Sequence, residues 1–167
     1  MFEDITSEVV LGRIGACHRD VRAMYDYWLA KRGSRAMPAR ADLEPAEIKK
    51  LLPMMVLVDV TADARRFVYR LVGTQEVAER GNDPTGKSVA EAFFGGSVEE
   101  SLSCYEYVAR NRAPFCYRDP YADADGQLQT DDIIYLPLSD DGVAVNMILV
   151  FTHCYNFRRR TKSTSLL

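Results

Sequence analysis

The segment from Gly81 to Ser88 reads GNDPTGKS and matches the phosphate-loop pattern GxxxxGK[ST] letter for letter. In such a loop, backbone N–H groups bind the phosphates, the lysine contacts the terminal phosphates and the hydroxyl residue holds Mg²⁺. That chemistry requires a buried strand that runs directly into the loop. The preceding TQEVAER is polar and helix-like, and Asp83 places a negative charge where a phosphate would lie. We therefore predict a structural turn here, with a phosphate-loop nucleotide-binding protein as the alternative.

Metal chemistry has few candidate ligands. The run from Asp123 to Gly126 is similar to part of a calcium loop, but Tyr121 occupies the position that should open it and no glutamate closes it. A hairpin turn is the better interpretation. The two histidines, His18 and His153, are expected on the N-terminal helix and at the end of the last strand, where they serve packing or the surface. We predict no metal site.

The four cysteines are Cys17, Cys104, Cys116 and Cys154, and no two of them form a CxxC pair. This spacing favours reduced intracellular thiols over a disulfide framework or a zinc site. We interpret Cys104 and Cys116 as small, buried hydrophobic residues, and a redox-sensor role for either is the alternative.

Catalysis finds little support in the residue pattern. A nucleophile, histidine and acid set would need a histidine near a serine or cysteine, and both histidines lie at the edges of the predicted domain. The pairs Asp131-Asp132 and Asp140-Asp141 cannot act jointly, because neighbouring residues of a strand point to opposite faces. We predict no catalytic residues and a protein that is not an enzyme.

Composition and charge narrow the class of protein. A chain of 167 residues with 47% hydrophobic residues is long enough for one domain with its own core. The net charge of −3 argues against a nucleic-acid partner. The acidic start, Met1 to Glu8, lacks the features of a signal peptide, and the longest apolar stretch, residues 143–151, is too short to span a bilayer. We expect a cytoplasmic protein without membrane insertion.

The elements that must position any site begin with helices. Residues 13–31 are predicted to form one helix, because Val21, Met24, Tyr25 and Trp28 keep to a single apolar stripe. Gly33 follows the last turn, as helix ends prefer. A second, short helix is expected to begin at Pro45 and to stop before Pro53.

Five strands and one longer helix follow. Residues 54–60 and 66–73 are β-branched runs joined by a polar turn, and residues 114–121, 127–138 and 143–151 form a meander whose turns are marked by Asp-Gly dipeptides. Between these groups lie short helical turns and a helix that starts at Ser97, where Ser97 and Glu100 form a capping box. The order predicts an α+β fold, with helices over one face of a five-stranded antiparallel sheet.

This order of elements resembles the PAS domain superfamily. The chain is most similar to a bacterial family of stand-alone, single-domain PAS proteins with an N-terminal helical extension. The stretches that carry the resemblance are YDYWLAKRGSRAMPARADLEPAEIKKLLPMMVLVDV, RFVYRLVGTQEVAERGNDPTGKSV and IIYLPLSDDG. The resemblance divides the chain into an N-terminal helical extension (1–53), a PAS-like core (54–152) and a basic C-terminal tail (153–167).

The resemblance also implies where a ligand would bind, which is between the sheet and its helices. The residues that we expect to line such a cavity are Tyr69, Arg70, Phe93, Tyr105, Tyr135, Asn146 and Met147. Among these, Arg70 and Asn146 are polar positions in apolar strands, so each would lie either in the cavity or on the solvent face. Neither histidine lies on the Ser97 helix, where a haem ligand would be expected, and the NCRFLQ-type motif of flavin light sensors is absent. We predict no haem or flavin, with an unidentified small ligand as the alternative to an empty cavity.

The function implied by the resemblance is that of a sensory or adaptor domain in bacterial signal transduction. It would act by binding a small ligand, by protein–protein interaction, or by both. We expect a homodimer formed through the N-terminal helix, because aromatic and methionine side chains are common at interfaces, and signalling proteins such as histidine kinases as partners. The alternative for the helix is packing against the sheet. The rival functions are a pure interaction scaffold and a small-molecule enzyme on a cystatin-like fold.

Overall fold

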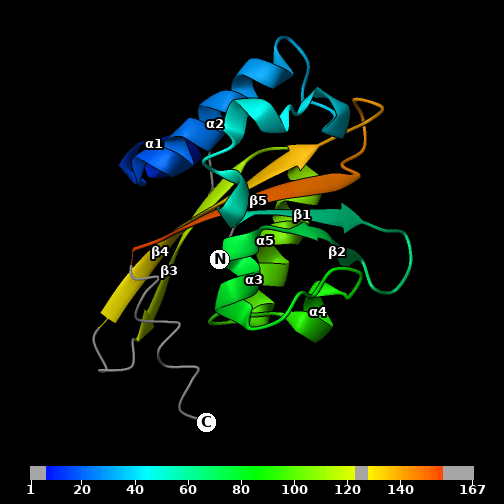
Figure 1. Cartoon of the computed structure of the whole chain (residues 1–167). Coiled ribbons are helices and arrows are strands. Elements are labelled where there is room, and N and C mark those ends of the chain that lie inside the picture. The colour runs from blue at the N-terminus through cyan, green and yellow to red at the C-terminus, as the bar shows by residue number, and fades with distance from the viewer. Residues whose placement is uncertain (1–6, 123–127, 156–167) are drawn as a thin grey trace.

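The computed structural model describes residues 7–122 and 128–155, and five of its elements are strands of one antiparallel sheet (Figure 1). The strands are β1 (Met55–Val60), β2 (Phe67–Val72), β3 (Phe115–Ala122), β4 (Leu128–Leu138) and β5 (Met147–Cys154). Their order across the sheet is β2-β1-β5-β4-β3, and every neighbouring pair is antiparallel. The predicted α+β fold with a five-stranded antiparallel sheet is confirmed.

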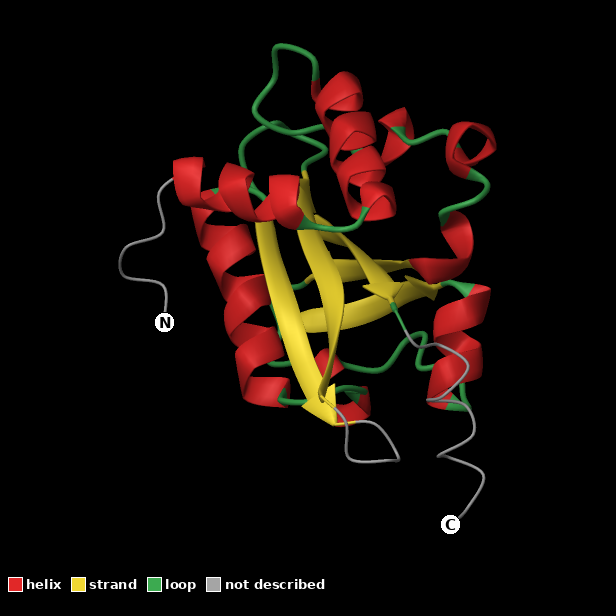
Figure 2. Cartoon of the chain, turned by 90° about the vertical axis from the view of Figure 1, so that its left-hand side faces the viewer, coloured by secondary structure: helices red, strands yellow, loops and turns green. Residues whose placement is uncertain are grey.

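Helices cover both faces of this sheet. The helices α3 (Thr74–Arg80), α4 (Val89–Ala92) and α5 (Val98–Asn111) lie on one face, and α1 (Ser7–Ala16) and α2 (Arg19–Arg32) lie on the other (Figures 1 and 2). Three short 3₁₀ turns, Arg40–Asp42, Pro45–Ile48 and Leu52–Met54, lead from α2 into β1. The N-terminal helical segment thus forms a second layer, so that β4 and β5 are covered by helices on both faces of the sheet.

The N-terminal segment contains two helices rather than the single predicted one. The break falls at Cys17 and His18, where His18 accepts a hydrogen bond from the backbone N–H of Asp20 at 3.2 Å and so caps α2. A side-chain acceptor at this position satisfies one of the unpaired N–H groups of a helix start. The stripe of Val21, Met24 and Trp28 is completely buried against the sheet. Of the two expectations for this stripe, a dimer surface or packing against the sheet, the structure contains packing against the sheet.

Strand β2 carries a β-bulge at Arg70. Leu57 of β1 pairs with Leu71, whereas the next residue, Val58, pairs with Tyr69, so that Arg70 has no partner residue in β1. An extra residue of this kind interrupts the alternation of faces. Phe67 and Tyr69 point towards the α5 face as the alternation predicts, but Leu71 is turned outward and is 40% exposed.

The connection between β4 and β5 is longer than the predicted tight hairpin at Asp141-Gly142. It covers residues 139–146, and the Asp141 carboxylate accepts hydrogen bonds from the N–H groups of Val143 and Ala144 at 2.8 and 2.9 Å. These bonds fold residues 143–146 into the loop, so β5 begins at Met147 and extends to Cys154. The other predicted hairpin, at Asp125-Gly126, lies outside the described residues.

Helix α5 begins where its sequence signal predicts. Ser97 accepts a hydrogen bond from the N–H of Glu100 at 3.2 Å, and Cys104, Tyr105 and Val108 form its buried face. No helix within residues 7–122 and 128–155 is both long and apolar enough to cross a bilayer.

Candidate functional site

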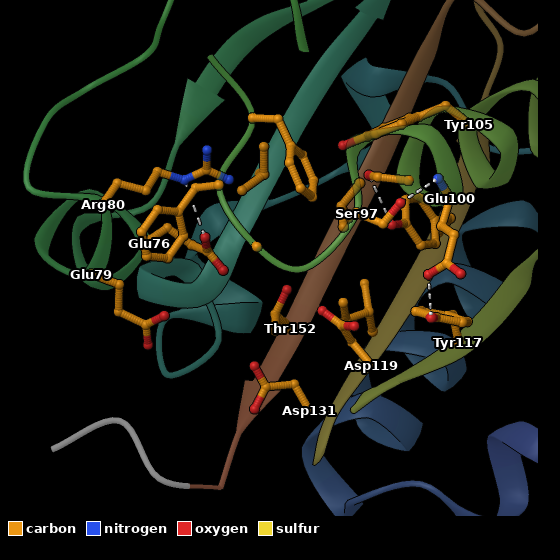
Figure 3. A pocket seen from close by; sticks show the side chains of 18 of the residues that line it. Glu76, Glu79, Arg80, Ser97, Glu100, Tyr105, Tyr117, Asp119, Asp131 and Thr152 are labelled. Carbon is orange, nitrogen blue, oxygen red and sulfur yellow. Dashed lines mark hydrogen bonds and ion pairs between the residues drawn. The ribbon is translucent and has the colours of Figure 1, made fainter. Parts of the chain in front are cut away.

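A pocket lies between the sheet and helices α3 and α5, with the segment 93–97 at its side (Figure 3). Its cavity volume is about 70 Å³, which is room for a few water molecules or a very small ligand. Four of the seven residues predicted to line a cavity do line this one: Tyr69, Phe93, Tyr105 and Tyr135. Whether they bind a ligand remains a prediction.

The other three predicted residues lie elsewhere. Arg70 sits at the β-bulge, and its exposed guanidinium is 3.9 Å from Asp59. Asn146 orders the β4–β5 connection, because its side-chain oxygen accepts from the N–H of Asp140 at 2.8 Å. Met147 pairs with Leu138 at the start of β5 and is buried. Arg70 thus lies on the solvent side, as the second alternative states, whereas Asn146 lies outside the strands, in the β4–β5 connection.

A buried ion pair stands at the α3 end of the pocket. Glu76 and Arg80 are one helical turn apart, and the Arg80 Nε lies 3.5 Å from the Glu76 carboxylate with both side chains less than 10% exposed. Arg80 also stacks on the ring of Tyr69, at 5.0 Å, and donates to its hydroxyl at 3.3 Å. The arginine is therefore fixed by an acid, a hydroxyl and an aromatic face at once.

Burial decides the charge state of Glu76. Loss of solvent disfavours the charged carboxylate and raises its pKa from an ordinary 4.5 to about 7, although the positive charge of Arg80 acts in the opposite direction. The neighbouring Glu79 adds to the upward shift. The charge of the pocket therefore changes close to neutral pH.

Further acids lie along the side of the pocket nearest Thr152, where Figure 3 shows Glu79 of α3 together with Asp119 and Asp131 of the sheet. The thiol of Cys154 contacts two of them, at 3.6 Å from Glu79 and 3.5 Å from Asp131. Asp119 is the cross-strand partner of Asp131 in the β3–β4 ladder. Carboxylates of three different elements therefore converge on one place.

Aromatic side chains form the floor and the α5 wall. The ring of Tyr105 stacks on Phe67 at 5.2 Å and meets Tyr135 edge-on at 5.1 Å. Tyr117 donates its hydroxyl to the carboxylate of Glu100 at 2.8 Å, on the same side of the pocket. The site thus combines π faces with a surplus of acids over bases: Glu76, Glu79, Glu100, Asp119 and Asp131 against Arg80.

Sequence reasoning missed the charged half of this site. From the sequence, TQEVAER is predicted only as a polar, helix-like segment, and Asp131 only as one of two adjacent acids that cannot act jointly. The spacing of Glu76, Glu79 and Arg80 was a usable signal, because residues three and four apart share one face of a helix. Helix α3 starts two residues after β2 ends, and this short connection brings the charged face of α3 against the sheet.

The phosphate-loop lookalike forms a turn between α3 and α4. Gly81 ends α3 in a left-handed conformation, Asp83 accepts from the N–H of Thr85 at 3.0 Å, and Ser88 caps α4 through Glu91. The N–H groups that would bind a phosphate are already used, since that of Gly86 donates to Tyr69 and that of Lys87 to Pro84. This geometry gives the nucleotide-binding alternative no support.

The two histidines meet at the other face of the sheet. The rings of His18 and His153 are stacked with centroids 3.4 Å apart, and the Nδ1 atoms of both lie within 3.8 Å of the Asp20 carboxylate. Parallel rings do not aim their nitrogens at a common point, and the His18 Nδ1 is already engaged as the cap of α2. The absence of a resident metal stays a prediction.

Known structures with a similar fold are distant in sequence. A light-oxygen-voltage domain probed with a flavin analogue is 8% identical, with a TM-score of 0.49, and the match covers 72% of this chain and 90% of that chain. The PAS domain of an HTR-like protein from Haloarcula marismortui is 17% identical, with a TM-score of 0.41 over 65% and 89% of the two chains. A cysteine variant of the fungal photoreceptor VVD is 10% identical, with a TM-score of 0.47 over 77% and 92%.

Family membership rests on the sequence itself. No curated protein matches the chain. A family model described as PAS domain matches residues 16–150, which takes in α2, all three 3₁₀ turns and most of the sheet. The chain belongs to the PAS domain family.

Proposed function

We propose that this PAS domain is a sensor whose pocket between the sheet, α3 and α5 binds a small, positively charged amine. The observation that carries the proposal is the convergence of acids and aromatic rings in that pocket. Transmission of the bound state to a separate signalling protein is the sensory or adaptor role that we assign to the domain.

The charge balance favours a cation as the ligand. One base, Arg80, faces five acids, and that base is paired with Glu76 at 3.5 Å. The carboxylates of Glu79 and Asp131 are close together, because both contact the Cys154 sulfur. A ligand ammonium group would interact favourably with this pair of carboxylates. The rings of Tyr105 and Tyr135 line the same pocket, and aromatic rings attract ammonium groups.

The size of the cavity favours a small ligand. At about 70 Å³ it is well below the roughly 300 Å³ at which ordinary cofactor and drug sites begin. A flavin would need α3 or α5 to move away from the sheet, and no cofactor forms part of this proposal. A short-chain amine needs a much smaller displacement.

The binding experiment uses the intact chain and a matched set of ligands. Primary amines, a short polyamine, a guanidino compound and carboxylic acids of equal length are compared by isothermal titration calorimetry and by thermal shift. We expect the amines alone to bind, and native mass spectrometry after mild purification to show one such molecule on the chain. Binding of the carboxylic acids but not of the amines would refute the proposed ligand class.

Variants separate a specific site from general charge attraction. Glu79→Gln and Asp131→Asn should each weaken amine binding about tenfold or more, the loss expected for one charge-assisted hydrogen bond. Glu106→Gln removes the same charge from a surface ion pair with Arg66, outside the pocket, and should leave the affinity unchanged. Equal losses in all three variants would point to the net charge of the protein rather than to the pocket.

The homodimer and the histidine-kinase partners remain predictions. The stripe expected to form the dimer surface is occupied within the chain, where Trp28 and its neighbours pack on the sheet. Light scattering on the intact chain would establish its oligomeric state.

A further inference from the structure

Two cysteine thiols meet at the junction between the N-terminal helices and the sheet. Cys17 lies in the break between α1 and α2, Cys116 lies in β3, and their sulfur atoms are 2.9 Å apart. The two residues are far apart in the sequence, so only the packing of the N-terminal layer on the sheet brings them together. A disulfide bond of about 2.05 Å is less than 1 Å of sulfur movement away.

The surroundings of the pair assign different roles to its two thiols. The hydrogen bond from Cys116 lowers the pKa of the Cys17 thiol, and the positive charges of Arg118 and Arg22 assist, while burial and Asp132 oppose the shift. The same hydrogen bond, together with burial, raises the pKa of Cys116. Cys17 is therefore the thiol that ionises and attacks an oxidant, and Cys116 is the thiol that then forms the disulfide with it.

A small oxidant can reach the pair. Both cysteines line a surface hollow of about 370 Å³, together with Arg13, Phe115 and Arg118. The residues themselves are only 7% and 2% exposed, which excludes large reagents more strongly than small ones. The two arginines of the hollow favour the anions that form when a peroxide is cleaved.

We propose that Cys17 and Cys116 are a hydroperoxide-reactive thiol pair that closes to a reversible disulfide between the α1–α2 junction and strand β3. The Cys17 thiolate attacks one peroxide oxygen, the O–O bond breaks, and Cys17 becomes a sulfenic acid while the departing oxygen takes up the proton that Cys17 had lost. The Cys116 sulfur then forms the S–S bond and displaces the hydroxyl group as water. Two thiols and one hydroperoxide give one disulfide, one alcohol (or water) and one water, with two electrons passing from sulfur to oxygen.

The disulfide would act at the joint between two layers. The residue after Cys17 is His18, whose backbone N–H donates to the buried Asp132 of β4 at 2.8 Å. Closure of the bond therefore fixes the start of α2 to β3 in addition to its existing contact with β4. Reduction restores the freedom of the N-terminal helices to separate from the sheet.

The other two cysteines serve as matched controls. Cys104 is completely buried in α5, and burial raises its pKa to about 12, which leaves it inert. The sulfur of Cys154 lies 3.6 Å from the Glu79 carboxylate and 3.5 Å from that of Asp131. Neither is placed next to a second cysteine sulfur within the described residues.

The test treats the reduced, intact chain with one equivalent of hydrogen peroxide and, separately, of an organic hydroperoxide. Intact mass spectrometry should show the loss of two hydrogen atoms, and non-reducing peptide mapping should find the Cys17 peptide joined to the Cys116 peptide. The oxidised chain should unfold at a higher denaturant concentration than the reduced chain, and dithiothreitol should reverse both changes. Mapping on the native chain needs no variant, so it does not depend on how well a variant folds.

Variants then identify the attacking sulfur. In the Cys116→Ser variant, the sulfenic acid at Cys17 should persist and be labelled by a sulfenic-acid probe. The Cys17→Ser variant should take up almost no probe. The Cys104→Ser and Cys154→Ser variants should still form the internal disulfide. Disulfides that involve Cys104 or Cys154, disulfides between two chains, or sulfinic acid without any S–S bond would each overturn the proposal. Amine binding at the pocket is measured separately, so its failure would leave this result unaffected.

Discussion

Trp28 of α2 donates its indole N–H to the backbone carbonyl of Pro137 in β4, at 2.8 Å. The indole is only 1% exposed, so the bond lies in the centre of the layer between the helix and the sheet. This bond ties the N-terminal segment to the PAS core, and its loss should be costly, because a buried carbonyl without its donor costs more than the bond itself contributes.

Replacement of this tryptophan tests the attachment. Trp28→Phe should lower the free energy of unfolding by about 2 to 4 kcal/mol, since it leaves the Pro137 carbonyl without its donor and creates a cavity. Because Trp28 is the only tryptophan, unfolding in urea is followed by circular dichroism. Tyr27→Phe removes a hydroxyl that accepts from the N–H of Glu44 at an exposed site, and should cost less than about 1 kcal/mol. If Trp28→Phe and Tyr27→Phe lower the free energy of unfolding equally, the bond to the Pro137 carbonyl contributes no more than an exposed hydrogen bond does.

Asp132 holds the α1–α2 break on the sheet. Burial alone would raise its pKa, but hydrogen bonds from Arg118, Tyr155 and the His18 N–H outweigh burial and hold the pKa below its ordinary value of 3.8. Its contribution is therefore present above about pH 4 and is lost as the pH falls through the lowered folded-state pKa. Asp132→Asn should reduce stability at neutral pH by about 2 to 4 kcal/mol, as measured by urea unfolding. Arg118→Gln should cost about 1 kcal/mol or less, because that guanidinium is half exposed.

Glu76 should give stability the opposite dependence on pH. Its folded-state pKa of about 7 exceeds the ordinary 4.5, so the folded chain holds this proton more tightly than the unfolded chain does. The stabilisation is complete below pH 4.5 and is lost as the pH rises to about 7, with a total on the order of 3 kcal/mol. Glu76→Gln should flatten the profile between about pH 5 and about pH 8, because the variant has no carboxyl group to titrate here. If the Glu76→Gln variant keeps the pH profile of the native chain, the titrating group lies elsewhere.

Gly73 allows the chain to pass closely from β2 into α3. A Cβ atom here would collide with the backbone carbonyls of Leu52 and Pro53, and backbone cannot move aside as a flexible side chain can. Gly73→Ala should therefore destabilise the fold by about 3 kcal/mol or more in thermal unfolding. Gly81→Ala is the comparison: its φ of +75° is strained for alanine, but the space around it is open, so about 1 kcal/mol is expected.

The sheet and its order were predictable because their signals are local. Alternating apolar runs mark the strands, and Ser97 marks the start of α5, since each of these features depends on residues a few positions apart. The break at Cys17 and His18 was not predictable in this way. The apolar stripe continues through it, and the break depends on Asp132 of β4, which accepts from the His18 N–H.

The candidate site was predictable in its aromatic half and not in its charged half. Tyr69, Tyr105 and Tyr135 are apolar enough to suggest burial, and they line the pocket. Glu76 and Arg80 suggest solvent when each is considered alone, and only their mutual contact allows them to be buried. The bulge at Arg70 has no local signal either, because it arises from the pairing of β2 with β1.

The turn at residues 84–88 has one more consequence, for self-association. Strand β2 lies at the edge of the sheet, where unpaired backbone groups invite pairing with another chain. Here Tyr69 donates to Lys87 and accepts from Gly86, and Val68 forms a bridge with Ser88, so the turn covers this edge as a partial sixth strand. We therefore expect a chain with this segment shortened to associate edge to edge, which light scattering would detect.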